Sequence, residues 1–241
     1  MKYKILLAAA SVAILAGCSD SDTDVIKSYT YTVSVENLTA NQPMSPLAVL
    51  VHNSDFQLFE VGHSASVALE HLAEGGSNAE LIAMMNDDDN IDQGISGNGL
   101  LLPGASDEVT ISINPNRFGY LSVASMLVNT YLSVASMLVN TNDAFVGEAG
   151  LSLKSLAVGE SYIMNMNVWD SGTELNDELA ATIPGPAGGG EGFNADRNDS
   201  SDIVSFHAGV ISQDDGLTDS ALSANHRFLN PGAKVTITRI E

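Results

Sequence analysis

Apolar and polar residues alternate in several short stretches of the chain, a period-two pattern typical of half-buried β-strands. The clearest example is residues 29–38, where Tyr31, Val33 and Val35 share one face. Further strands are predicted over residues 47–51, 108–113, 160–169, 203–206 and 234–240. Many short strands separated by turn signals, with little helix, indicate an all-β fold, an antiparallel β-sandwich.

Two short helices interrupt this pattern. Residues 66–73 have a helical composition, and the glycine pair that follows shortly afterwards is expected to end the first helix. Ser77 and Glu80 have the spacing of a capping box, which predicts a second short helix. Residues 86–99 are acidic and rich in glycine, and they are predicted to form a loop.

The segment Tyr120–Thr130 is repeated letter for letter as Tyr131–Thr141. Because strand side chains alternate, an insertion of eleven residues puts equivalent residues on opposite faces of one straight strand. We therefore expect one copy to form the native strand and the other to be extruded, bulged or added at an edge. The second copy is favoured because it runs directly into Asn142 and Asp143. The first copy has the competing advantage of a predicted hairpin to the strand that ends at Ile113.

Composition and charge narrow the range of functions. The 241 residues include nine Lys and Arg against 30 Asp and Glu, a formal net charge of −21. Such a surface repels nucleic acid, so no nucleic-acid partner is expected. With 44% apolar and 16% charged residues the chain is expected to fold. No break in composition divides residues 29–241, which are interpreted as one domain.

The N-terminus has the features of a secretory leader. Lys2 and Lys4 precede a short apolar run, Ile5–Leu15, which is too short to span a bilayer. Residues 1–17 are therefore predicted to be a signal peptide. An ordinary cleaved leader followed by an incidental cysteine is the alternative.

The leader ends in the sequence LAGC, which resembles a bacterial lipobox and places Cys18 as the lipidated residue. Cys18 is the only cysteine, so no intrachain disulfide is possible. Ser19 follows it, where an aspartate would favour retention on the inner membrane. We therefore expect an outer-membrane lipoprotein, anchored through its acyl chains and joined to the domain by an acidic tether over residues 18–28.

Two acidic loops carry the candidate chemistry. Asp143 and Asp170 each follow a predicted strand, and small or glycine residues after them allow close backbone approach. Calcium binds six to eight oxygen ligands from carboxylates, carbonyls and water, so two converging strand-end loops are suited to hold it. The spacing alone leaves open the alternative that both acids are simply solvated.

Motifs for other chemistry are incomplete. Residues 88–92 and 196–200 imitate the start of an EF-hand loop, but both lack its glycine at the sixth position and its glutamate at the twelfth. The five histidines show no HExxH spacing, and no GxSxG nucleophile motif occurs. No catalytic residue is assigned, and the protein is not expected to be an enzyme. A metal-assisted hydrolase of the cell envelope is the alternative in that class.

A series of short motifs occurs in one order between Tyr31 and the C-terminus. They are Met44-Ser45-Pro46, Gly62–Ser66, Leu72–Gly76, Ser136–Val139, Asn142–Gly147, Trp169–Glu174, Ala181–Pro184 and Ala233–Ile237. In this order they resemble the spondin domain found at the front of F-spondin and mindin and in many bacterial lipoproteins. The resemblance implies an eight-stranded antiparallel β-sandwich similar to calcium-dependent lipid-binding domains, with one divalent-cation site.

Carried onto this chain, the cation ligands of the spondin family fall on Asp143 and Asp170. The third ligand, an acid in the preceding strand, maps onto Glu108, and Glu174 is a candidate outer acid. The duplicated segment lies between Glu108 and Asp143, and this is the main departure from the family pattern.

These observations predict a lipid-anchored binding or adhesion module of the bacterial cell envelope, with Ca²⁺ or another divalent cation in its strand-end loops. The expected partners are the membrane, through the N-terminal lipid, and a protein or glycan ligand of unknown identity. Two alternatives stay open: the metal-assisted hydrolase and a structural lipoprotein without a ligand.

Overall fold

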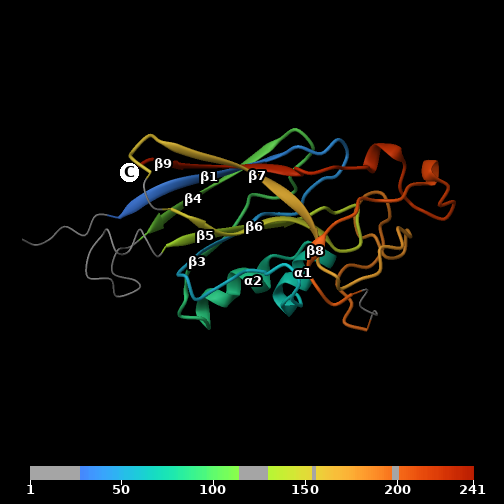
Figure 1. Ribbon diagram of the computed structural model, residues 1–241, viewed down its shortest axis with the longest axis horizontal. Helices are drawn as coiled ribbons and strands as arrows, with labels where there is room; N and C mark the ends of the chain where they lie inside the picture. Colours follow the sequence, from blue (N-terminus) through green and yellow to red (C-terminus); the bar gives the residue numbers. More distant parts are fainter. Residues whose placement is uncertain (1–27, 114–129, 154–155, 197–200) are drawn as a thin grey trace, which may run out of the picture.

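The computed structural model describes residues 28–113, 130–153, 156–196 and 201–241, which form nine β-strands and two short α-helices (Figure 1). The strands are β1 (Tyr29–Asn37), β2 (Ala48–His52), β3 (Ile91–Ser96), β4 (Ser106–Ile113), β5 (Tyr131–Met137), β6 (Ala144–Ser152), β7 (Ser161–Asp170), β8 (Ser205–Phe206) and β9 (Ala233–Arg239). The helices are α1 (Val67–Gly75) and α2 (Ala79–Ala83), and single 3-10 turns occur at Met84–Asn86, Gln213–Asp215 and Ala224–His226. The all-β prediction is confirmed, with one strand more than expected.

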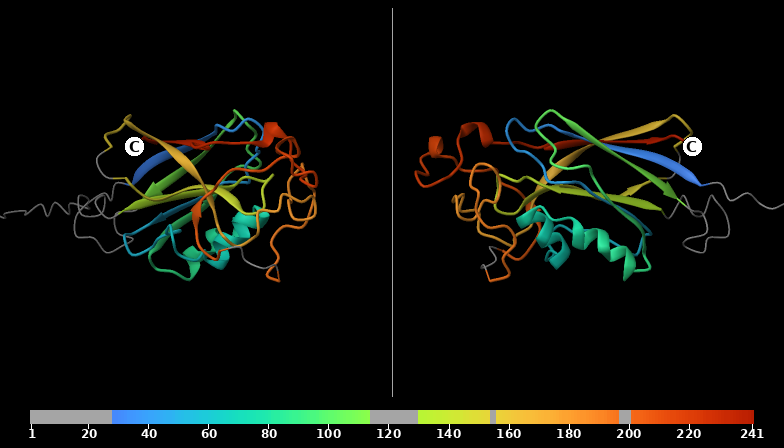
Figure 2. Two further views of the ribbon diagram at one scale, coloured as in Figure 1. Left: turned by 45° about the vertical axis from the view of Figure 1, so that its right-hand side comes forward. Right: turned by 180° about the vertical axis from the view of Figure 1, so that it is seen from behind.

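The strands are arranged in two layers that share strand β7 (Figure 2). Their order is β3-β2-β5-β6-β7-β9-β1-β4, all antiparallel, and β8 pairs with β7. The first part of β7, Ser161–Met166, pairs with β9, and its last residues, 167–170, pair with β6. This change of partner carries the end of β7 into the second layer, where Asp170 lies opposite Ala144.

The core has two parts, because the layer of β2, β5 and β6 is covered on both faces. Between the layers lie apolar side chains such as Tyr31, Val33, Val49, Ile111 and Val146. Between this layer and the helices lie Leu50, Leu69, Leu72, Phe145 and Trp169. Successive residues of one strand serve the two cores in turn, as the period of two requires. The strands that lead to the candidate site are therefore held from both sides.

The helix boundaries follow from capping, with one correction. Helix α1 begins after Ser66, whose hydroxyl accepts an early backbone N–H, and it ends at Gly76, whose φ of +70° is left-handed. The predicted capping box of the second helix is wrong, because Asn78 is the residue at the N-cap. Ser77 instead donates its hydroxyl to the carboxylate of Glu80 at 2.8 Å.

The alternation of apolar and polar residues does not predict two of the strands, β3 and β6. The predicted loop over residues 86–99 is wrong, because it contains strand β3. Gly94 lies so close to α2 that a Cβ would be 2.7 Å from the carbonyl oxygen of Ile82, so the glycine that suggested a loop permits strand and helix to touch. Strand β6 is missed because consecutive residues such as Phe145 and Val146 are both buried.

Strand β5 is formed by the second copy of the repeat, the copy favoured by its continuity with Asp143. It pairs with β2 on one side and β6 on the other. Leu132 and Val134 contribute to the core between the layers, and Ala135 to the helix-side core. The first copy, apart from Thr130, and the predicted turn after Ile113 lie outside the described residues.

The predicted leader and lipidation site, within residues 1–27, also lie outside the described residues. No helix among the described residues is long and apolar enough to cross a membrane. The lipid anchor stays a prediction from the sequence.

Candidate cation site and adjoining pocket

Asp143 directly precedes β6 and is fully buried. Its Oδ2 atom accepts hydrogen bonds from Ser171 Oγ at 2.9 Å and from the backbone N–H groups of Thr173 at 2.9 Å and Glu174 at 3.1 Å. Its Oδ1 atom has no hydrogen-bond donor among the described residues. One oxygen is thus fully engaged and the other is buried without a donor, which is unfavourable for an ionised carboxylate.

The loop that supplies these donors turns sharply at Gly172. Its φ is +76°, and a Cβ built there would lie 2.4 Å from the carbonyl oxygen of Ile203. Glycine is needed on both counts, because other residues are strained at this φ and their side chain has no space. The turn then directs the next two backbone N–H groups at Asp143.

Burial is the largest influence on the ionisation of Asp143. Burial first, and the negative charge of Asp170 second, raise the pKa of this carboxyl to about 7. The three hydrogen bonds to Oδ2 act in the opposite direction but do not overcome burial. A nearby cation would shift the balance toward the ionised form.

Asp170 is the last residue of β7, and it pairs with Ala144, the residue that follows Asp143. Its Oδ1 accepts the backbone N–H of Gly172 at 2.8 Å, and its Oδ2 accepts Nδ2–H of Asn176 at 2.6 Å. A carboxylate oxygen has two lone pairs, so acceptor capacity remains on both. The structure thus places Asp143 and Asp170 close enough for the charge of one to act on the other.

His207 and Asn176 are two members of this site that the sequence reasoning missed. His207, just after β8, accepts the backbone N–H of Gly209 on Nδ1 at 2.9 Å, which assigns the ring proton to Nε2. That nitrogen lies 3.3 Å from Asn176 Oδ1. Burial lowers the pKa of His207, while the charge of Asp170 opposes the shift. Asn176 lies in the same loop as Asp170, which was a usable signal, but nothing in the local sequence marks His207.

Glu108, the expected third ligand, is not brought to this pair. It lies in β4, where Val109 points into the core and Glu108 is exposed on the outer face. Strands β1 and β9 separate β4 from β7 in the sheet. The side-chain alternation of β4 turns Glu108 toward solvent, so the structure brings Asp143 and Asp170 together without it. Glu174 contributes through its backbone, and its own side chain is buried.

The donor set suits a hard cation, although it is small. Among the described residues no three His, Cys, Asp or Glu side chains are grouped to hold a metal ion. The two carboxylates of Asp143 and Asp170 offer only oxygen, the ligand type that calcium prefers. Backbone carbonyls and water would have to complete the six to eight ligands of calcium. The donor-free Oδ1 of Asp143 is the observation that fits such an ion.

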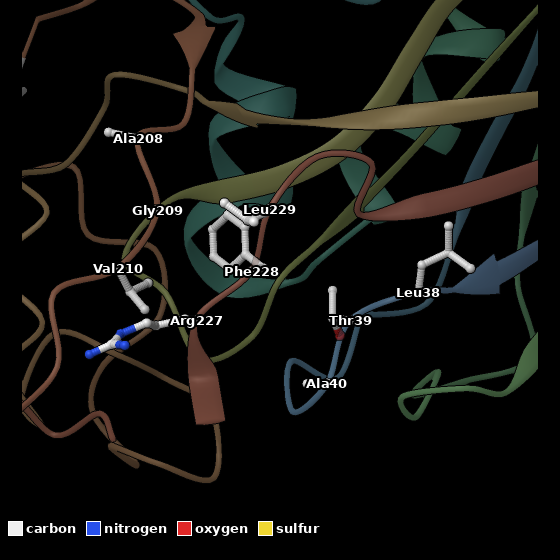
Figure 3. A pocket seen from close by; sticks show the side chains of 9 residues that line it. All are labelled: Leu38, Thr39, Ala40, Ala208, Gly209, Val210, Arg227, Phe228 and Leu229. Carbon is white, nitrogen blue, oxygen red and sulfur yellow. The ribbon is translucent and has the colours of Figure 1, made fainter. Parts of the chain in front are cut away.

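A pocket of about 560 Å³ adjoins this end of the sandwich (Figure 3). It is lined by three segments: Leu38–Ala40 after β1, Ala208–Val210 after β8, and Arg227–Leu229 before β9. Figure 3 shows the ring of Phe228 among these side chains and the guanidinium of Arg227 turned away from it. The volume falls within the range of ligand pockets in proteins.

A short series of contacts joins the pocket to the two acids. Asn176 bonds to Asp170 on one side and to His207 on the other. His207 in turn accepts the N–H of Gly209, and its ring lies 5.2 Å from the ring of Phe228. Gly209 and Phe228 both line the pocket. The position of the Asp170 carboxylate is thus linked to the pocket wall through two side chains.

The comparison with known families identifies the class of protein. The Spondin_N family model, the N-terminal domain of spondins, matches residues 34–178. The matched region is more than half of the chain and contains both Asp143 and Asp170, so the chain belongs to the spondin N-terminal family. A comparison with curated proteins finds no match. His207 and most of the pocket lie beyond the matched residues.

Proposed function

We propose that this chain is a lipid-anchored binding module of the bacterial cell envelope, with adhesive function, whose partner-binding end is stabilised by a divalent cation of the calcium type. The observation that carries the proposal is Oδ1 of Asp143, a buried carboxylate oxygen without a donor among the described residues. Asp170 lies beside it and repels it. A divalent ion replaces this repulsion by two attractions.

The ion would act on the arrangement of loops. Asp143 precedes β6, Asp170 ends β7, and the loop after Asp170 already donates to Asp143. A cation bound by both acids would hold these segments together at the end of the β6–β7 pairing. Because Asp143 is fully buried, an ion against it is better placed to hold loops than to polarise a substrate. This favours a binding role over catalysis.

The two ends of the sandwich also suit a tethered binding module. Strand β1 begins at Tyr29, the residue to which the expected tether leads. Its other end, Asn37, lies opposite Ala233, which in turn lies opposite Met166. The start of β1 therefore lies at one end of the sandwich, whereas β8 and the last residues of β7, which carry Asp170, lie toward the other (Figure 1). A lipid at the N-terminus would leave the cation end facing away from the membrane.

Thermal unfolding of residues 19–241 with calcium or with a chelator tests the cation site. Extracellular modules bind calcium with Kd of ~0.1–1 mM. At about a hundredfold excess over Kd, calcium should stabilise by about 2.7 kcal/mol, a rise in Tm of about 5–10 °C. Asp143→Ala and Asp170→Ala should each abolish the rise.

Glu108→Ala is the matched control, since Glu108 is an acid of the same sheet that lies away from the pair. It should keep the full calcium response. A rise that persists in both Asp143→Ala and Asp170→Ala would show that calcium binds elsewhere. No rise in the wild-type protein with calcium, magnesium or manganese would remove the cation from the proposed function.

A further inference from the structure

The side chains that line the pocket beside the acids are mostly apolar, and the two polar ones, Thr39 and Arg227, already have partners. The hydroxyl of Thr39 lies 2.7 Å from Asn37 Oδ1, and the guanidinium of Arg227 is paired with the carboxylate of Asp215. The rest of the lining is aliphatic, aromatic or glycine. These side chains favour an apolar occupant, because a polar group that enters loses water and finds few side-chain partners.

The rim of the pocket is also apolar and unusually exposed. Leu229 is 88% exposed and Leu38 is 41% exposed. Large side chains held in solvent around a pocket are typical of surfaces that bind another macromolecule. The neighbouring turn carries Asp214 and Asp215, and the chain as a whole has a net charge of −21. Electrostatic complementarity therefore favours a basic partner.

We infer that this pocket is the partner-binding site of the module and takes a large apolar side chain presented by a basic polypeptide segment. The inference rests on the proposed function for its link to the cation. The cation orients Asp170, and the contacts through Asn176 and His207 reach the pocket wall. Calcium should therefore increase the affinity of the pocket for its occupant.

Calorimetric titration with designed peptides tests the pocket. The probe is a heptapeptide with one central phenylalanine flanked by lysines and serines, and its controls carry alanine in the centre or glutamate in place of lysine. The phenylalanine–lysine peptide should bind, and either control should lose at least tenfold in affinity. Leu229→Ser should weaken binding about tenfold without affecting folding, because Leu229 is almost fully exposed. Val158→Ser, which changes another exposed apolar residue (63% exposed) away from the pocket, should have no effect.

The outcomes separate the pocket from the cation. Equal binding of all three peptides, or unchanged binding by Leu229→Ser, overturns the pocket assignment even if calcium stabilises the protein. Peptide binding that is specific but insensitive to calcium and to Asp143→Ala supports the pocket and removes its link to the cation site.

A second and independent inference comes from the repeat. Strand β5 uses the second copy, and each of its side chains is also available from the first copy, residue for residue. In the observed arrangement residues 114–130 connect β4 to β5, and residues 138–143 connect β5 to β6. If the first copy formed β5, the connections would be 114–119 and 127–143. The two connections keep the same lengths, six and seventeen residues, in exchanged places.

Either copy supplies the same side chains to the strand itself. The contacts of β5 with β2 and β6 would be the same, because the side chains are the same. The entropy of closing the loops depends on their lengths, and those are exchanged rather than changed. What differs is the position of the extra residues, which in the second arrangement directly precede Asn142 and Asp143. We propose that the two copies exchange in the β5 position, and that the observed arrangement is the one that keeps Asp143 in place.

Copy-specific substitutions test the exchange. Val134 is fully buried, and Val123 is its equivalent in the first copy. If the copies exchange, Val134→Asn and Val123→Asn alone each lower Tm by only a few degrees, because the intact copy forms β5. The double variant should lose about 10 °C or more.

A chain that lacks residues 120–130 is the control, because it has only one copy of the repeat and therefore cannot exchange copies. Val134→Asn in that shortened chain should unfold it, while the same substitution in the full chain leaves a folded protein. If Val134→Asn is as damaging in the full chain as in the shortened one, and Val123→Asn is silent, the copies do not exchange.

Discussion

Asp143 and Asp215 are two aspartates whose surroundings shift their ionisation in opposite directions. Asp215 accepts hydrogen bonds from the side chain and backbone of Ser212 at 2.7 and 2.9 Å, and Arg227 pairs with both of its oxygens. These contacts, with those from Ser212 the strongest, lower the pKa of Asp215 to about 2. Asp143 has three donors on one oxygen, none on the other and a second acid beside it, and its pKa is raised to about 7.

The difference shows where the chain provides its own counter-charge and where it does not. Asp215 is stable as a carboxylate because Ser212 donates two hydrogen bonds to it and a guanidinium of the same chain faces it. Asp143 has a comparable number of donors, but burial and the acid beside it outweigh them. An acid that is buried without a counter-charge is a candidate for a charge that comes from outside the chain.

The largest expected effect is a pH dependence in the absence of a cation. The folded-state pKa of Asp143 lies above its unfolded value, so its contribution to stability is complete below about pH 4 and is lost as pH rises to about 7. The loss should be on the order of 2–4 kcal/mol. Urea unfolding in a chelator at a series of pH values measures it. In Asp143→Asn this decline should be much reduced.

Two other groups bear on that measurement. Burial also raises the pKa of Glu178, which acts in the same sense, whereas burial lowers the pKa of His207, which acts in the opposite sense. Glu178→Gln is therefore the matched control. If the decline in stability disappears in Glu178→Gln but persists in Asp143→Asn, the pH dependence comes from Glu178, and the prediction for Asp143 is contradicted.

The turn that directs donors at Asp143 gives the next largest effect. Gly172→Ala adds a methyl group 2.4 Å from a carbonyl oxygen at a left-handed φ. We expect a loss of about 2–3 kcal/mol in unfolding free energy together with weaker calcium binding. Gly159→Ala has a similar φ of +85° but open space, and it should lose only about 1 kcal/mol and keep the calcium response. Equal losses at the two glycines would contradict a packing role for Gly172.

Removing the counter-charge of Asp215 should lower the stability by less, and its pH dependence should lie in a more acidic range. With Arg227→Met the pKa of Asp215 should rise part of the way to its usual range, because the hydrogen bonds from Ser212, which lower it most, remain. Because the folded-state pKa is lowered, the stability that it contributes is present above about pH 4 and is lost as pH falls toward about 2. The Tm of the variant should therefore fall slightly below wild type at pH 7 and approach it near pH 2. The calcium response should be unchanged, and its loss would link this pair to the cation site.

The smallest effect is expected at Glu108. Glu108→Gln should change the unfolding free energy by less than about 0.5 kcal/mol, because its side chain is exposed on the outer face of β4. A fall in calcium affinity by tenfold in this variant would restore Glu108 as a ligand and contradict the geometry of β4.

The fold was accessible from the sequence wherever side chains alternate between core and solvent. Strand β1 shows this, with Tyr31, Val33 and Val35 inside and polar residues between them. Strands β3 and β6 were not accessible in this way. Gly94 of β3 serves a close contact with α2, and consecutive buried residues in β6 remove the alternation.

The site was predictable only as far as local sequence reaches. Asp143 and Asp170 could be named because each follows a strand and matches a family motif. The assignment of Glu108 followed the order of motifs along the chain and left out the alternation of β4, in which Val109 points into the core and Glu108 toward solvent. His207 was missed because its proximity to Asp170 comes from the pairing of β8 with β7, more than thirty residues apart.

Terbium luminescence excited through Trp169 tests most directly whether a cation lies between the two acids. Trp169 is the only tryptophan and precedes Asp170, so a terbium ion in a calcium site there should receive its excitation energy. The wild-type protein should show sensitised emission that calcium displaces, and Asp143→Asn and Asp170→Asn should lose it. Sensitised emission that is absent from the wild-type protein, or unchanged in both variants, would contradict the site.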